Sequence, residues 1–132
     1  MGLVFLPLSG GELRTWAGAG RLPGPRDGYA VTPSMLEAFE VDDQEDAEYT
    51  ALSIASLAGL LAHGERVVAV VDLPVTDAGD EWGSVSVGDV PFTAVTAIFG
   101  EDSDPAQASA AALTVAGLDL TSAWEQPVVQ AL

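Results

Sequence analysis

The sequence contains no cysteine, no lysine and no asparagine, and its only histidine is His63. The lack of cysteine excludes a disulfide scaffold, a thiolate nucleophile and a cysteine zinc site, and the lack of asparagine excludes N-glycosylation. A single histidine excludes any metal site that takes two histidines from one chain. Because phosphate contacts draw on clusters of lysine and arginine, and the chain has only four arginines, nucleic acid is not an expected partner.

Acidic side chains dominate what is present. The 132 residues include 20 aspartates and glutamates, the formal net charge is −16, and 48% of the residues are hydrophobic. This hydrophobic content favours a folded core despite the charge, and the length is typical of one domain. We therefore expect residues 1–132 to form a single globular domain. The missing lysine and asparagine, beside 14 glycines, favour the codon bias of a GC-rich genome. The alternative is a halophile, in which acidic surfaces and the loss of lysine keep proteins soluble.

No segment of the sequence predicts contact with a membrane. The most apolar run, residues 51–62, is about half the length needed to span a bilayer. The first eight residues lack the basic region of a secretory signal. We expect a cytoplasmic protein.

Hydrophobic periodicity and turn residues predict a succession of helices and strands. Strands are expected at 3–6, 28–32, 67–71, 82–87 and 92–99, and helices at 12–16, 33–39, 47–63 and 106–115. The order β-α-β-α-α-β-β-β-α predicts an α/β (α+β) fold, a single-domain sandwich with helices packed on a five-stranded mixed sheet. The tail from 118 to 132 has no clear assignment.

Local patterns add detail to this prediction. The β-branched run at 67–71 is typical of a central strand covered on both faces. The two segments on either side of Gly88 and Asp89 predict a hairpin. Ser9 and Thr32 are expected to cap the helices that follow them.

Four phrases of the sequence together resemble a known family. They are Val4 to Pro7, Tyr29 to Pro33, Glu45 to Tyr49 and Arg66 to Pro74. In combination they resemble a family of small acidic actinobacterial proteins that is classed as a domain of unknown function. The resemblance implies no activity and no catalytic residue.

The densest group of carboxylates lies just before and inside an expected helix. Its members are Asp42, Asp43, Glu45, Asp46 and Glu48. Such a group can be a solvated helix start, a docking surface for a partner or a site for a hard cation. The calcium-loop pattern fails because alanine takes the place of its glycine, and a helix would let only two or three of these groups converge.

Two further residues are candidates for binding. Asp72 ends a strand expected to be buried, where it could serve as an acid or base or simply cap the following turn. Trp82 follows two acidic residues in a polar segment, and we expect its ring to be exposed and available to a ligand. His63 precedes a glycine at the expected end of a helix, where a cationic side chain is favourable.

The sequence favours a non-catalytic binding or interaction protein that presents an acidic face to a basic protein partner. The alternative is a small carboxylate-based enzyme, with or without Mg²⁺, built from Asp72 and the segment 42–48. Convergence of these groups in one concave pocket would favour the enzyme, and their spread over a convex surface would favour the binding protein. We expect no cofactor and no resident metal.

Overall fold

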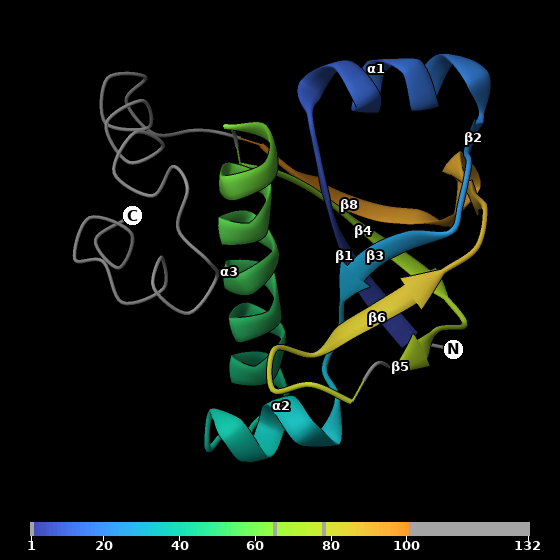
Figure 1. Cartoon of the computed structure of the whole chain (residues 1–132). Coiled ribbons are helices and arrows are strands. Elements are labelled where there is room, and N and C mark those ends of the chain that lie inside the picture. Colours follow the sequence, from blue (N-terminus) through green and yellow to red (C-terminus); the bar gives the residue numbers. More distant parts are fainter. Residues whose placement is uncertain (1, 65, 78, 101–132) are drawn as a thin grey trace.

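The computed structural model describes residues 2–64, 66–77 and 79–100 of the chain. The fold is a β-sheet that is covered on both faces (Figure 1). One long helix lies on one face of the sheet, and a shorter helix with a two-stranded ribbon lies on the other. The helices are α1 (Gly10–Ala19), α2 (Pro33–Ala38) and α3 (Gln44–His63), with a 3₁₀ turn, η1, at Phe92–Ala94.

The main sheet has six strands in the order β5-β6-β3-β1-β4-β8, and the ribbon pairs β2 with β7. The strands of the main sheet are β1 (Gly2–Leu8), β3 (Arg26–Tyr29), β4 (Val67–Leu73), β5 (Thr76–Asp77), β6 (Ser84–Val87) and β8 (Val95–Phe99). Those of the ribbon are β2 (Arg21–Leu22) and β7 (Val90–Pro91). The α+β class is confirmed. Every described strand pair is antiparallel, however, so the sheet is not the mixed sheet that we expected, and the two-residue β5 adds a sixth strand.

The position of strand β4 explains why its first five residues, Val67 to Val71, are all apolar. It lies between β1 and β8, and its side chains alternate between two separate cores. Val67, Ala69 and Val71 face α1 and the ribbon, whereas Val68 and Val70 face α3. The prediction of a strand covered on both faces is confirmed. Helix α3 covers one face, and α1 with the ribbon covers the other, so the apolar sequence is explained although the neighbouring strands are antiparallel.

Helix α3 supplies the cover on one face. Asp43 caps its start by accepting a hydrogen bond from the Asp46 amide, and Gly64 ends it in a left-handed conformation with φ of 72°. Ile54 is fully buried against the sheet residues Phe5 and Val70, whereas Tyr49 on the same helix is 71% exposed. Helix α3 therefore packs on the sheet through the face that contains Ile54.

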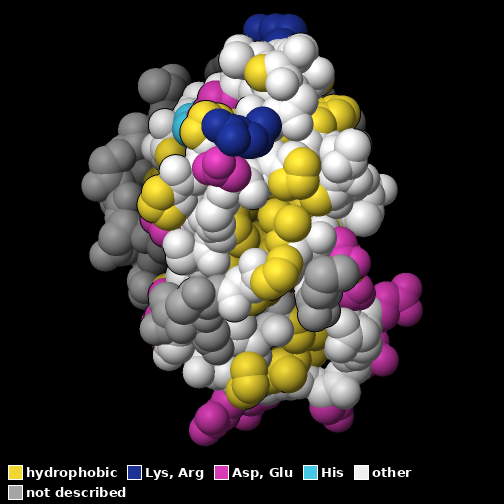
Figure 2. All heavy atoms as spheres, turned by 90° about the vertical axis from the view of Figure 1, so that its right-hand side faces the viewer, with side chains coloured by type: hydrophobic (Ala, Val, Ile, Leu, Met, Phe, Trp, Pro, Cys, Tyr) yellow, Lys and Arg dark blue, Asp and Glu magenta, His cyan; other side chains and the backbone are white. Residues whose placement is uncertain are grey.

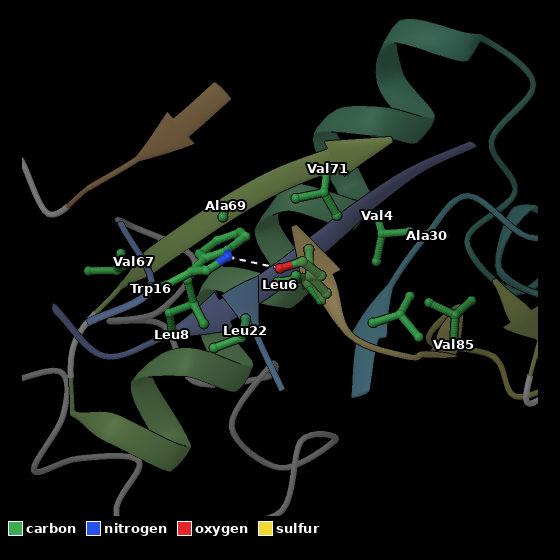
Figure 3. Close-up of a cluster of buried hydrophobic side chains, with 12 residues drawn as sticks. Val4, Leu6, Leu8, Trp16, Leu22, Ala30, Val67, Ala69, Val71 and Val85 are labelled. Atoms are coloured by element: carbon green, nitrogen blue, oxygen red, sulfur yellow. Dashed lines mark hydrogen bonds between the residues drawn. The ribbon is translucent and has the colours of Figure 1, made fainter. Parts of the chain in front are cut away.

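The opposite face is closed by α1 and the ribbon. The Trp16 indole lies in a buried cluster with Leu8, Leu22 and Val67, and its Nε1–H donates a 2.9 Å hydrogen bond to the Val90 carbonyl (Figure 3). The Phe92 ring meets the indole edge to face, with centroids 5.1 Å apart. This one side chain therefore joins α1 to the ribbon.

The expected hairpin between 82–87 and 92–99 is wrong. Strand β6 pairs with β3 and β5, and β8 pairs with β4 on the other side of the sheet. The turn at Gly88 and Asp89 does not fold the chain back on itself, because the Asp89 carboxylate binds the Gly24 amide at 2.8 Å and Val90 pairs with Leu22 in the ribbon. The helix expected at 106–115 and the tail 118–132 lie outside the described residues.

None of the helices in the described ranges is long and apolar enough to cross a membrane.

Candidate functional site

The arginines all lie at one end of the molecule, which we call the arginine end. Arg14 is in α1, Arg21 is in β2, Arg26 starts β3 and Arg66 directly precedes β4. These positions are close because the end of β1 leads into α1 and pairs with the start of β4. On the face seen in Figure 2, the visible basic side chains lie toward the top of the molecule, which carries α1, and many acidic side chains lie toward the bottom.

Acidic partners accompany two of these arginines. Arg21 lies 3.3 Å from the Asp89 carboxylate, and Arg26 donates a 3.1 Å hydrogen bond to Glu12. The other carboxylate oxygen of Glu12 accepts from the Ser9 amide at 3.2 Å, which completes a capping box, and lies 3.7 Å from His63 Nε2. Ser9 and Thr32 are both N-caps, as predicted.

The pKa of Glu12 reflects these contacts. Burial would raise it, but the Ser9 amide, the Arg26 guanidinium and the His63 imidazole outweigh burial and hold the pKa below its usual value of 4.5. Glu12 therefore joins α1, β3 and the end of α3 through its charge.

We expect Glu12→Gln to lower the free energy of unfolding at neutral pH by about 1 kcal/mol, since partly exposed ion pairs and helix caps are each worth about that much or less. The lowered pKa means that the folded protein takes up the proton less readily than the unfolded chain. The stabilisation is therefore complete above about pH 4.5 and is lost as the pH falls through the folded-state pKa. Urea unfolding from about pH 7 to about pH 3 should show the difference between the two proteins shrinking at the acidic end.

Glu81→Gln is the matched control, because it removes the same charge from an exposed turn. The free energies of unfolding of Glu81→Gln and of the wild-type protein are expected to differ little over the whole pH range. A constant difference for Glu12→Gln down to about pH 3 would show that the charge of Glu12 does not stabilise the fold.

The opposite end of the molecule carries the group of carboxylates predicted from the sequence, and we call it the acidic end. It is formed by the segment 42–48 at the start of α3, together with the starts of β1 and α2. Asp42, Asp43 and Glu45 are exposed there, and Glu48 is half-buried. Since α3 runs from this end to His63 beside Glu12, its length separates the carboxylates of the segment from Arg26.

A cavity of about 340 Å³ lies at the acidic end. It is lined by Gly2, Leu3, Phe5, Ala30, Val31, Thr32, Pro33, Gln44, Glu48 and Val75. Most of these side chains are apolar, and the polar ones are Thr32, Gln44 and Glu48. Thr32 is 5% exposed and its hydroxyl oxygen accepts a 3.2 Å hydrogen bond from the Met35 amide, so the more exposed Gln44 and Glu48 are the groups best placed to recognise a ligand.

The structure brings few of the predicted site residues together. Glu48 lines the cavity, whereas Asp42, Asp43 and Glu45 are exposed and line no part of it. Asp72 is exposed at the end of β4 and pairs in register with the cavity residue Leu3, so it stands beside the cavity without lining it.

Trp82 is not exposed as we expected. It is half-buried against the core under α3, and its ring lies 5.5 Å from that of Phe39. The cause is the turn before it, where the Asp80 carboxylate accepts hydrogen bonds from the Trp82 and Ser84 amides and turns the chain inward. Burial opposes the charged form of Asp80, but these amides and the Ser84 hydroxyl prevail and lower its pKa.

The apolar walls of the cavity were missed by sequence reasoning. Leu3 and Phe5 belong to a strand, Thr32 and Pro33 to a helix start, and Val75 follows another strand. Nothing in the local sequence pattern indicates that β1 lies between β3 and β4 and brings these residues together. Within residues 2–64, 66–77 and 79–100, no three side chains among His, Asp and Glu are grouped so that they could hold a metal ion.

Comparison with known proteins gives one match. A model described as a family of unknown function, DUF6912, matches residues 3–130. Searches of curated proteins and of solved structures gave no match. The resemblance to a family of unknown function is confirmed, and it extends beyond the described residues.

Proposed function

Because the chain belongs to DUF6912, a family of unknown function, we propose a function from its own charges and cavity: it is a non-catalytic protein that binds a basic partner at its acidic end. The observation that carries this proposal is the separation of charge. All four arginines lie at the arginine end, where Glu12 and Asp89 are paired with two of them.

This separation matters because the net charge is −16. Carboxylates that face arginines have part of their field cancelled, whereas among the described residues no arginine forms an ion pair with the exposed carboxylates of segment 42–48. A surface with one sign of charge attracts a partner of the opposite sign and raises the rate of association. The acidic end is thus the surface to which a basic protein would be drawn.

The alternative enzyme requires Asp72 and segment 42–48 to converge. In the described part of the chain Glu48 is the one carboxylate of this set that lines the cavity, and the carboxylates Asp42, Asp43, Glu45, Asp46 and Asp72 are exposed outside it. A single carboxylate does not provide the paired acid and base that such chemistry uses. We therefore propose binding and not catalysis.

The test is calorimetric titration of the full chain with a short peptide of alternating arginine and glycine. Screening lengths are about 30 Å at 0.01 M salt and about 8 Å at 0.15 M, so binding should weaken markedly over this range. The double variant Asp42→Asn, Glu45→Gln should weaken binding at low salt by about fivefold, because each rim charge contributes a fraction of a kcal/mol.

The matched control is Asp27→Asn, Asp89→Asn, which removes two exposed carboxylates near the arginine end. It should change the affinity by less than about twofold. Equal weakening by the two double variants would show that net charge alone attracts the peptide, and binding that does not respond to salt would contradict the electrostatic basis of the proposal.

A further inference from the structure

We propose that the cavity at the acidic end receives one arginine or lysine side chain of the basic partner, with its aliphatic stem against the apolar walls and its cation on Glu48. This inference rests on the proposed function and names the contact that would make it specific.

The walls suit an aliphatic stem. Phe5 is buried beneath the cavity, while Leu3 and Val75 are 37% and 40% exposed and stand at its opening. Apolar surface of this kind is stabilised when a hydrocarbon chain covers it. The volume of about 340 Å³ is near the lower limit of pockets for small molecules, which are roughly 300–1,000 Å³, so it fits one long side chain.

The polar groups suit a cation. Gln44 and Glu48 are four residues apart on α3 and therefore lie on the same face of the helix, toward the cavity. Both can accept hydrogen bonds from a guanidinium or ammonium group. Among the described residues, no side chain forms a hydrogen bond or ion pair with the Glu48 carboxylate, so this acceptor is available.

Other ligand classes fit less well. An anion would be repelled by Glu48 and by the exposed carboxylates of segment 42–48, which include Asp42 and Glu45. A neutral apolar ligand would remove water from Glu48 without supplying a hydrogen-bond donor, which is unfavourable. A cation on an aliphatic stem satisfies both the walls and the carboxylate.

The direct test uses n-butylguanidinium as the probe and n-butylurea as its neutral control, both added to the full chain. NMR titration should move the methyl signals of Leu3 and Val75 with butylguanidinium and leave them nearly unchanged with butylurea. Absence of these shifts with butylguanidinium would overturn the cavity assignment.

Variants then assign the cation contact. Glu48→Gln should weaken butylguanidinium binding by about tenfold, the loss expected for one charge-assisted hydrogen bond. Glu45→Gln removes an equal charge from the same turn of α3 outside the cavity and should weaken it by about twofold or less. Val75→Ala, at an exposed wall position, should weaken it by about twofold to threefold through lost apolar contact. Equal effects of Glu48→Gln and Glu45→Gln would overturn the inference.

The peptide titration separates this inference from the proposed function. If the basic peptide binds in the salt-dependent way described above while Glu48→Gln has no more effect than Glu45→Gln, the cavity inference fails and the proposed function stands. If butylguanidinium binds in the cavity and the peptide does not bind, the proposed function fails and the cavity remains a site for small cations. If neither binds, both fail.

Discussion

Replacing Trp16 with alanine is expected to lower the free energy of unfolding by about 3–5 kcal/mol, the range for removing a buried aromatic side chain. The indole is 1% exposed and is the largest fully buried side chain in the described core. Its removal takes away the edge-to-face contact with Phe92 and leaves the Val90 carbonyl without its hydrogen bond. Urea unfolding followed by far-ultraviolet circular dichroism measures the loss without depending on tryptophan fluorescence.

Trp16→Phe separates these two contributions. A phenyl ring keeps an aromatic surface in the core but supplies no N–H, so the Val90 carbonyl loses the indole hydrogen bond in both variants. We expect Trp16→Phe to cost about 1–3 kcal/mol, the range for removing one partner of a buried hydrogen bond. If Trp16→Ala cost less than about 1 kcal/mol, α1 would not close this face of the sheet as described.

Ile54→Ala is expected to lower the free energy of unfolding by about 2–5 kcal/mol, because the side chain is fully buried between α3 and the sheet. Lost burial and the space left beside Phe5 and Val70 both contribute. Chemical denaturation of the two proteins measures the difference, and an unchanged slope with denaturant would show that the fold is retained.

Tyr49→Ala is the control on the same helix. This side chain is 71% exposed, so the substitution should change stability by less than about 0.5 kcal/mol. If the two substitutions had similar effects, the face of α3 that meets the sheet would be wrongly assigned.

Features that depend on nearby residues could be predicted from the sequence. Ser9 and Thr32 cap helices because their side chains reach amides three residues further on, and Gly64 ends α3 because it adopts a left-handed conformation. The run from Val67 to Val71 indicated a strand with two covered faces, because every one of its side chains is apolar.

Features that depend on distant residues could not be predicted in this way. The hairpin was wrong because strand pairing depends on more than the intervening turn. Val90 lies opposite Leu22 in a separate ribbon, and its carbonyl binds an indole 74 residues away. The mixed sheet was wrong because the apolar content of β4 reports its two covers and carries no information on the direction of its neighbours.

For the same reason, only part of the candidate site could be predicted from the sequence. The concentration of acidic residues before α3 is visible in the sequence, and it contains Glu48. The apolar walls come from β1, the start of α2 and the segment after β4, and only the folded sheet brings them together. The expected exposure of Trp82 was wrong because the hydrogen bonds of Asp80 turn the ring toward Phe39.

The position of β1 in the sheet has a consequence for synthesis of the protein on the ribosome. This strand is made first, yet it lies between β3 and β4, and its pairing with β4 runs from Gly2–Leu73 to Leu8–Val67. At a translation rate of about 5–20 residues per second, β4 follows β1 after roughly 3–13 seconds. Until then the apolar run from Val4 to Leu6 lacks its longest neighbour, so this apolar surface and the unpaired edge of β1 stay exposed in the nascent chain during this interval.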